Sequence, residues 1–417
     1  MNTPRTHGPL TSLEAALAAI RAHATPLASE DVPLQKAIGR VLAEELKSVR
    51  DLPSADVSMM DGYAIRTADA DSPLGASFEV KYEVKAGDAP AKHPLRKTEA
   101  VRIFTGAPLP PGADCVVMQE QTTREGNLLK LTGPTPKLGQ HLRKRGEEVR
   151  SGVRVLAVGA ILGGADLSLA AGACGAVARC YRRPRVAILT TGDELVPIGS
   201  TPGPGQLVET NSLSLAPLCT EAGAEVLLLG LAGDSVTDIA AALLAADADV
   251  LVTTGGASVG DHDHAQSALE KLGGKLVFHS VAIRPGKPIL FGTAASLVPG
   301  GRERLVFGLP GNPAAATLGF ELFVRPALRL LQGDPRHERT VAKAELRGPI
   351  TRAPGLTFFP RGHAFLEGSK LCFKPGGQQN SMQIASWSQV NAVAVVPPGE
   401  GKLEAGTEVD VRLLGML

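Results

Sequence analysis

The segment that most constrains the fold runs from Val250 to Asp263 and reads VLVTTGGASVGDHD. Its first four residues are apolar or β-branched and two glycines follow soon after, which predicts a buried parallel strand that ends in a loop. Glycines at such a strand end let backbone N–H groups approach an anionic ligand. The segment also fits an ordinary turn into a helix with an aspartate N-cap, so taken alone it leaves both interpretations open.

Apolar runs and helical patterns alternate along the chain on both sides of this segment, over residues 184–333. The expected strands are 186–189, 225–231, 250–253, 275–283, 289–291 and 305–307, and the expected helices are 211–221, 234–246, 264–272 and a long helix after residue 312. Asn211, Asp234 and Asn312 are the expected helix N-caps. This alternation predicts a mostly parallel sheet with right-handed crossovers.

Charged residues follow several of these strands. The carboxyl ends of parallel strands share one edge of the sheet, and ligands of open α/β sheets bind at that edge. The residues expected there are Asp193, Glu194, Asp261, Asp263, Arg284 and Lys287. Cations neutralise phosphate, and carboxylates hold Mg²⁺. The sequence therefore predicts a site for an anionic ligand and a divalent metal.

The regions that flank this unit have different patterns. Residues 11–23 predict an amphipathic helix capped by Thr11, and residues 32–46 carry a second helical pattern. Short alternating runs over residues 51–139, and again after residue 333, predict half-buried strands. In the first of these β regions Asp61 and Thr105 each precede a glycine, and each position taken alone fits a turn or a strand end.

Composition excludes several classes of function. The 417-residue chain has a net charge of +1 and only 4% aromatic residues, which argues against a nucleic-acid partner. Five scattered cysteines without a C-x-x-C pair fit a reducing compartment, and no signal peptide or membrane-spanning segment is visible. We expect a cytoplasmic protein that binds neither membrane nor nucleic acid.

The sequence lacks the motifs of several common enzyme classes. It contains no Walker loop, no dinucleotide-binding glycine motif after the first expected strand and no nucleophile elbow. Ser258 is therefore expected to be a ligand or turn hydroxyl. His262 and His264 would diverge on a helix by about 200°, which favours Mg²⁺ over zinc at the neighbouring aspartates.

Seven short motifs occur in order from about residue 10 onward and resemble those of the molybdopterin molybdenumtransferases, which include the E domain of gephyrin. They are Ser58-x-Met60-Asp61-Gly62-Tyr63-Ala64, Thr105-Gly106-Ala107, Arg145-Gly146-Glu147, Thr191-Gly192-Asp193-Glu194-Leu195, Gly255-Gly256-x-Ser258-Val259-Gly260-x-x-Asp263, Pro285-Gly286-Lys287-Pro288 and Leu309-Pro310-Gly311-Asn312-Pro313. Each motif is weak alone, and the ordered set is specific. Arg284 departs from the family, in which lysine is common at that position.

The resemblance implies a multidomain α/β and β fold. A discontinuous, elongated linker domain would comprise residues 1–50 and 140–183, with a mostly-β domain, 51–139, inserted into it. Residues 184–333 would form the α/β molybdopterin-binding domain, and residues 334–417 a C-terminal β-barrel-like domain. The resemblance also implies a homodimer with each site at the subunit interface.

The implied reaction inserts molybdenum from molybdate into adenylylated molybdopterin, releases AMP and requires Mg²⁺. Implied partners are a molybdopterin adenylyltransferase and downstream proteins that mature molybdoenzymes. A molybdopterin adenylyltransferase and a non-catalytic dimeric scaffold are the alternative functions. The flanking domains and the Met-Asp-Gly-Tyr-Ala motif favour the molybdenumtransferase over the adenylyltransferase, and the complete set of acids and lysines argues against the scaffold.

Residue roles follow from the same resemblance. Catalytic roles are implied for Asp61 and Thr105, supplied by the second subunit, and for Glu194 and Lys287. Metal ligands are expected at Asp234, Asp261 and Asp263. The expected substrate-binding residues are Gly192, Asp193, Gly255, Gly256, Ser258, Gly260, Arg284, Pro310, Asn312, Pro313, Arg361 and Ser381.

Overall fold

The computed structural model describes residues 10–70, 76–89, 93–256, 264–298, 300–377 and 379–415. The chain forms two compact units. Unit 1 contains residues 1–30, 39–43 and 180–417, and unit 2 contains residues 31–38 and 44–179. No helix within the described ranges is long and apolar enough to cross a membrane.

A six-stranded sheet lies at the centre of unit 1. Its order is β16 (Glu225–Ala232), β13 (Arg185–Thr191), β17 (Val250–Thr254), β21 (Arg304–Leu309), β20 (Leu290–Ala294) and β18 (Lys275–His279). The first four strands are mutually parallel, and β20 is antiparallel to both of its neighbours. β18 is therefore parallel to the first four strands, and the carboxyl ends of these five strands lie at one edge of the sheet. This confirms the predicted mostly parallel sheet.

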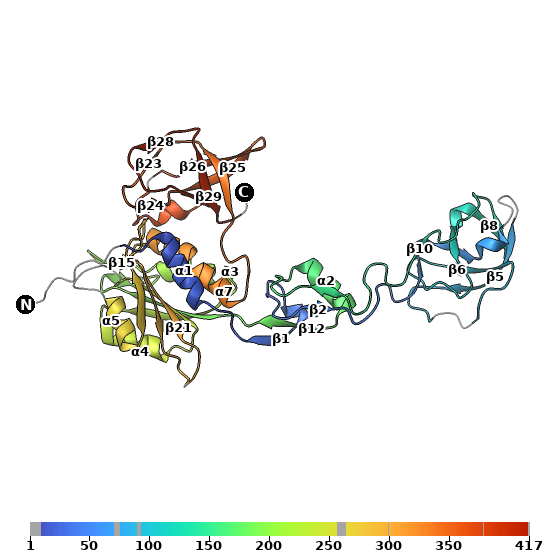
Figure 1. Cartoon of the computed structure of the whole chain (residues 1–417), viewed down its shortest axis with the longest axis horizontal. Coiled ribbons are helices and arrows are strands. Elements are labelled where there is room, and N and C mark those ends of the chain that lie inside the picture. Colours follow the sequence, from blue (N-terminus) through green and yellow to red (C-terminus); the bar gives the residue numbers. More distant parts are fainter. Residues whose placement is uncertain are drawn as a thin grey trace, which may run out of the picture. The chain divides into compact units, whose positions relative to one another are not determined.

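Helices cover both faces of this sheet (Figure 1). One face packs on α4 (Val236–Ala245) and α5 (His264–Lys271), and the other packs on α1 (Leu13–His23), α3 (Asn211–Glu221) and the run α6, η4 and α7. That run comprises Pro313–Gly319, Phe320–Val324 and Arg325–Leu331. Strand residues alternate between the two faces, since Val250 and Val252 pack on the face covered by α1 and α3, and Leu251 packs on the face covered by α4 and α5.

The C-terminal part of unit 1 is a closed five-stranded barrel. Its strands in barrel order are β22 (Val341–Leu346), β26 (Lys370–Pro375), β25 (Arg361–Glu367), β27 (Ala392–Val395) and β29 (Glu408–Leu413). The parallel pair β19 (Ile283–Arg284) and β24 (Thr357–Phe358) joins the barrel region to the sheet region. The remaining short elements are β14 (Leu195–Val196), β15 (Leu207–Val208), β23 (Ile350–Thr351), β28 (Lys402–Leu403) and η5 (Ile384–Trp387).

Unit 2 contains a second six-stranded sheet, in the order β7 (Cys115–Met118), β4 (Gly62–Ile65), β6 (Glu99–Ile103), β5 (Ser77–Val84), β9 (Leu128–Leu131) and β8 (Thr122–Glu125). Its two short strand pairs are β3 (Val57–Ser58) with β10 (Leu142–Arg143) and β2 (Leu46–Lys47) with β11 (Arg154–Leu156). A further pair, β1 (Ser29–Pro33) with β12 (Val177–Tyr181), includes residues of both units. The helical elements are α2 (Gly164–Ala173), η1 (Leu34–Lys36), η2 (Thr67–Asp69) and η3 (Gln119–Gln121).

The helix predicted over residues 32–46 is wrong, because only the single 3₁₀ turn η1 forms there. The backbone of Val41 accepts a hydrogen bond from Tyr181, and Leu42 forms a β-bridge with Cys180. These long-range bonds replace the bonds within a helix, so the apolar residues are buried without helical periodicity.

Three predicted N-caps are also wrong. Ser12 caps α1 in place of Thr11, whose backbone is bonded to Ser280, and Ser235 caps α4 in place of Asp234. The N-cap position of α3 is Thr210, and the Glu209 side chain accepts the Ser212 amide. In each case a neighbouring side chain reaches the free N–H groups of the first turn.

Candidate active site

Three loops meet at the carboxyl edge of the central sheet, and they meet at glycines. A Cβ atom on Gly255 would lie 2.2 Å from the Thr191 carbonyl oxygen, and Gly255 has φ +95°. A Cβ atom on Gly311 would lie 3.4 Å from the Gly255 Cα atom. The loops after β13, β17 and β21 therefore touch through backbone, which only glycine permits at position 255.

Two aspartates join the ends of β13 and β16. The Asp234 amide donates to Asp193 Oδ1 at 3.0 Å, and the Asp193 amide donates to Asp234 Oδ2 at 3.4 Å. The Glu194 carboxylate folds back over Gly192, where a Cβ atom would lie 2.7 Å from Glu194 Oε2. The structure thus brings Asp193 and Asp234 together at the ends of β13 and β16.

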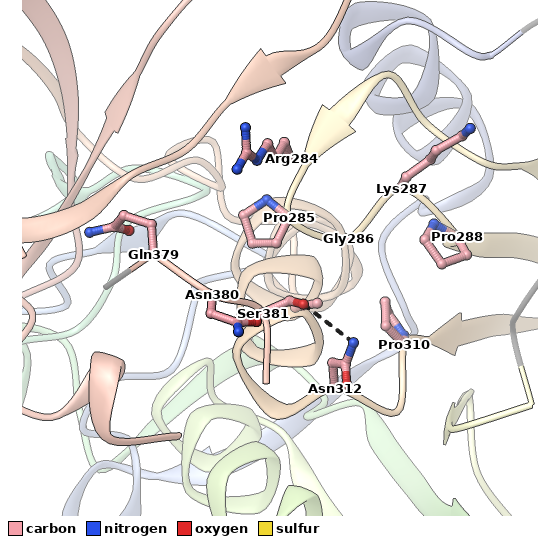
Figure 2. Close-up of a pocket in the computed structure, with 11 residues that line it drawn as sticks. Arg284, Pro285, Gly286, Lys287, Pro288, Pro310, Asn312, Gln379, Asn380 and Ser381 are labelled. Carbon is pink, nitrogen blue, oxygen red and sulfur yellow. Dashed lines mark hydrogen bonds between the residues drawn. The ribbon is translucent and has the colours of Figure 1, made fainter. Parts of the chain in front are cut away.

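A cavity of about 670 Å³ opens beside the same edge. It is lined by residues 284–288 before β20, by Pro310, Asn312 and Ala315 around the start of α6, and by residues 379–381 of the C-terminal region (Figure 2). Arg284 and Lys287 are both exposed side chains of this lining. Two cations on one loop of a concave surface suit an anionic ligand.

Asn312 occupies the predicted N-cap position of α6, but its side chain makes no capping hydrogen bond. Its Nδ2 group donates to Ser381 Oγ at 3.3 Å, the bond drawn in Figure 2, and the Ala314 amide donates to the Ser381 carbonyl at 3.2 Å. Pro313 occupies the first helical position. These two bonds fix the segment around Ser381 against the helix N-terminus.

A buried arginine lies behind residues 379–381. The Arg361 side chain is 1% exposed, and its Nη2 group donates to the Asn380 carbonyl at 3.1 Å. Among the described residues its Nε and Nη1 groups have no hydrogen-bond partner, and burial lowers the pKa of Arg361 to about 10. The guanidinium lies over the Trp387 ring, 5.9 Å from its centroid. Arg361 is therefore a buried cation next to the cavity, and two of its N–H groups, Nε and Nη1, are available as donors.

A separate polar cluster in unit 2 brings Asp61 and Thr105 together. Asp61 Oδ1 accepts hydrogen bonds from the Thr105 amide at 2.8 Å and from its hydroxyl at 2.9 Å. These donors, with a smaller contribution from the charge of Arg102, lower the pKa of Asp61 below its ordinary value. Gly62 begins β4, so Asp61 directly precedes a strand.

Ser258, Gly260, Asp261 and Asp263 lie outside the described residues. No cluster of three or more potential metal-ligating side chains occurs in the described ranges. Gln379 and Asn380 line the cavity but were missed from the sequence. The polar residues that follow Gly376 and Gly377 signal a loop there, but only the folded chain places it against α6.

Comparisons with known proteins cover most of the chain. Residues 11–174 match the family described as MoeA N-terminal region (domain I and II), residues 187–330 match a probable molybdopterin binding domain, and residues 343–414 match MoeA C-terminal region (domain IV).

Individual relatives align along nearly the whole chain. The molybdopterin molybdenumtransferase of Nostoc sp. is 38% identical over 93% of this chain and 89% of the relative. The enzyme of that name from Haemophilus influenzae is 35% identical over 93% and 94%. The crystal structure of a molybdopterin biosynthesis MoeA protein from Pyrococcus horikoshii superimposes with a TM-score of 0.82, at 30% identity, over 98% of this chain and 100% of that one. The chain therefore belongs to the molybdopterin molybdenumtransferases, transferases of molybdenum cofactor biosynthesis.

Proposed function

We propose that this enzyme inserts molybdenum from molybdate into adenylylated molybdopterin and releases AMP in a Mg²⁺-dependent reaction. The observation that carries the proposal is the cavity of about 670 Å³ that brings Arg284, Lys287, Asn312 and Ser381 together at the carboxyl edge of the sheet. Its cations and neutral polar groups suit an oxyanion, and its volume suits a small ligand.

The cavity residues divide into two groups by chemistry. Arg284 and Lys287 provide positive charge, while Asn312 and Ser381 provide neutral polar groups held by their mutual hydrogen bond. Arg361 adds a second source of positive charge from behind the loop of residues 379–381. Charge neutralisation and fixed orientation of the reacting phosphoryl and oxyanion groups would provide the catalysis.

Mg²⁺ fits the chemistry of the acidic pair. Asp193 and Asp234 each use one carboxylate oxygen for an amide, and within the described residues the second oxygen of each is available to bind a cation. Carboxylate oxygens are the ligands that Mg²⁺ prefers. A bound Mg²⁺ would neutralise phosphate charge, and Asp261 and Asp263 are proposed as further ligands from the adjoining loop. Glu194 and the backbone of Gly192, Gly255 and Gly256 would complete this end of the site.

We further propose a homodimer in which Asp61 of the partner subunit enters the site. The support is chemical, since Asp61 and Thr105 form a polar pair exposed on the surface of unit 2. Met59 and Met60, which are 51% and 38% exposed, give that surface an apolar margin suited to a protein contact. A cytoplasmic location and contacts with an adenylyltransferase and with maturation proteins remain predictions.

The test is reconstitution with the purified full chain, adenylylated molybdopterin, molybdate and MgCl₂. AMP release and activation of an apo-molybdoenzyme are measured together. We expect both to occur with the wild type and both to depend on molybdate and Mg²⁺. ATP consumption with bare molybdopterin would instead identify an adenylyltransferase, and no turnover with either substrate would favour a scaffold.

A binding measurement locates the anion. Molybdate is titrated into the wild type and into Lys287→Gln, Arg284→Gln and Lys402→Gln, the last being an exposed cation on β28 outside the cavity. We expect weaker binding in the two cavity variants by about tenfold, since each loses one charged contact worth roughly 1.5 kcal/mol. Wild-type affinity in both cavity variants would place the anion elsewhere.

A further inference from the structure

The side chain of Asp61 is held on one oxygen only. Thr105 donates both its amide and its hydroxyl to Asp61 Oδ1, and within the described part of the chain no hydrogen bond to Oδ2 occurs. This leaves Oδ2 as the atom that can meet a ligand. How well that atom is aimed depends on how rigidly the backbone of Asp61 and Gly62 is held.

Arg102 donates hydrogen bonds to two residues near this carboxylate, Gly62 and Gln119. Its Nη1 group donates to the Gly62 carbonyl at 3.2 Å, and its Nη2 group donates to Gln119 Oε1 at 2.5 Å. The backbone N–H of Gln119 in turn donates to the Asp61 carbonyl at 3.1 Å. Arg102 therefore links Gly62, the residue after Asp61, to Gln119, whose backbone bonds the Asp61 carbonyl.

The guanidinium of Arg102 is itself fixed by two aromatic rings. Its Cζ atom lies 5.1 Å from the ring centroid of Tyr63 and 4.8 Å from that of Phe104. Tyr63 is buried in the core of unit 2, and Phe104 immediately precedes Thr105. Contacts of this kind hold a planar guanidinium in one orientation, which the compact ammonium of lysine cannot reproduce.

The neighbouring strand β7 limits movement of the Gly62 backbone. A Cβ atom on Gly62 would lie 2.0 Å from the Val117 carbonyl oxygen, so β7 packs directly on the Gly62 backbone.

Among the described residues Arg102 has no ion pair, and its two hydrogen-bond acceptors are neutral. Its contacts therefore hold the backbone around Asp61 in place.

We propose that Arg102 is a positioning residue that, through Gly62 and Gln119, holds the Asp61 carboxylate in one orientation with Oδ2 free for the substrate. The expected effect on the rate of AMP release rests on the proposed function. The structural consequence of this positioning can be measured without any substrate.

The kinetic test uses the full chain and the AMP-release assay with Arg102→Gln, Arg102→Lys and the control Lys85→Gln. Lys85 also lies over the Phe104 ring, at 6.0 Å, but contacts neither Gly62 nor Gln119. We expect both Arg102 variants to lose about 10²-fold in kcat, the usual effect of misplacing a reacting group by about 1 Å. We expect KM to change by less than about twofold, because ground-state binding is retained. Lys85→Gln is expected to match the wild type.

Two kinetic results would overturn the proposal. Recovery of wild-type kcat in Arg102→Lys would show that charge alone is needed. A rise in KM at unchanged kcat would show that Arg102 binds substrate directly. Thermal unfolding of each variant ensures that the lower kcat is measured on folded protein.

The second readout is the pKa of Asp61, followed by carbon NMR of the full chain labelled in its aspartate carboxyl groups and assigned with Asp61→Asn. Arg102→Lys keeps the positive charge, so a rise in the Asp61 pKa toward its ordinary value would report weaker hydrogen bonds from Thr105. An unchanged pKa in both Arg102 variants would refute the positioning role. If the wild type releases no AMP, the proposed function fails, while this measurement still tests Arg102.

Discussion

Asp193 and Asp234 exchange hydrogen bonds, because the backbone amide of each donates to the side-chain carboxylate of the other, at 3.4 and 3.0 Å. The two residues follow β13 and β16, which are neighbours in the central sheet. The exchange therefore holds two carboxylates together at the edge where ligands of such sheets bind. Within the described residues this exchange uses one oxygen of each carboxylate, and the other oxygen is the one proposed to bind Mg²⁺.

Replacement of Asp234 by asparagine separates its hydrogen bond to Asp193 from its proposed binding of Mg²⁺. Asp234→Asn keeps an oxygen that accepts the Asp193 amide but removes the charge. We expect the Mg²⁺ concentration for half-maximal AMP release to rise by at least about tenfold, because hard carboxylates dominate Mg²⁺ affinity. The control is Asp238→Asn, which removes an exposed acid from the first turn of α4. Equal Mg²⁺ dependence in both variants would exclude Asp234 as a ligand.

Substitution of Gly255 tests the contact of the three loops. A methyl group at Gly255 would meet the Thr191 carbonyl at 2.2 Å and would also occupy a positive φ. We expect Gly255→Ala to lower the free energy of unfolding by about 2–5 kcal/mol, from overpacking and the left-handed backbone together. Gly273→Ala is the matched control, since Gly273 has φ +64° but no atom within 4 Å of its Cβ position. That variant should lose only about 1–2 kcal/mol in urea unfolding.

Truncation of Phe307 tests the core beneath the site. Phe307 is 0% exposed on β21, and its ring centroid lies 4.9 Å from that of Phe291. We expect Phe307→Ala to lose about 3–5 kcal/mol of unfolding free energy. Leu228→Ala on the edge strand β16, where the side chain is 52% exposed, should change it by less than about 0.5 kcal/mol. Similar losses in both variants would contradict the assigned burial.

The pair of Arg182 and Asp249 predicts a pH dependence of stability. Burial alone raises the pKa of Asp249, but hydrogen bonds from both Arg182 Nη groups and from the Arg185 amide outweigh it and lower the net pKa. A depressed folded pKa stabilises the fold above the unfolded value of about 3.9. That stabilisation is lost as the pH falls through the folded value.

Asp249→Asn should therefore be less stable than the wild type at neutral pH. The difference in unfolding free energy should shrink as the pH falls below the unfolded pKa of about 3.9 and then through the lower folded pKa of Asp249, because protonation removes the charge. Urea unfolding at a series of pH values checks this. A difference that stays constant across the series would show that the Asp249 charge does not contribute.

The sequence alone determined the regular parts of unit 1. The alternation of β-branched runs with capped helical patterns predicted the parallel sheet and placed Arg284 and Lys287 near its carboxyl edge. These signals are local, because strand burial and helix periodicity are written in neighbouring residues. The ordered motifs identified the family by resemblance, and the comparisons confirmed that membership.

Only the tertiary structure decided contacts between residues far apart in the chain. Local periodicity wrongly predicted a helix over residues 32–46, because Val41 and Leu42 bond to Tyr181 and Cys180. Gln379 and Asn380 line the cavity because the Ser381 segment bonds to α6, and no local pattern encodes that bond. The contacts that hold the backbone of Asp61 and Gly62 likewise come from Arg102 and Gln119, which lie in two other segments. Such contacts depend on which distant surfaces pack together, so they appear only when the whole chain has folded.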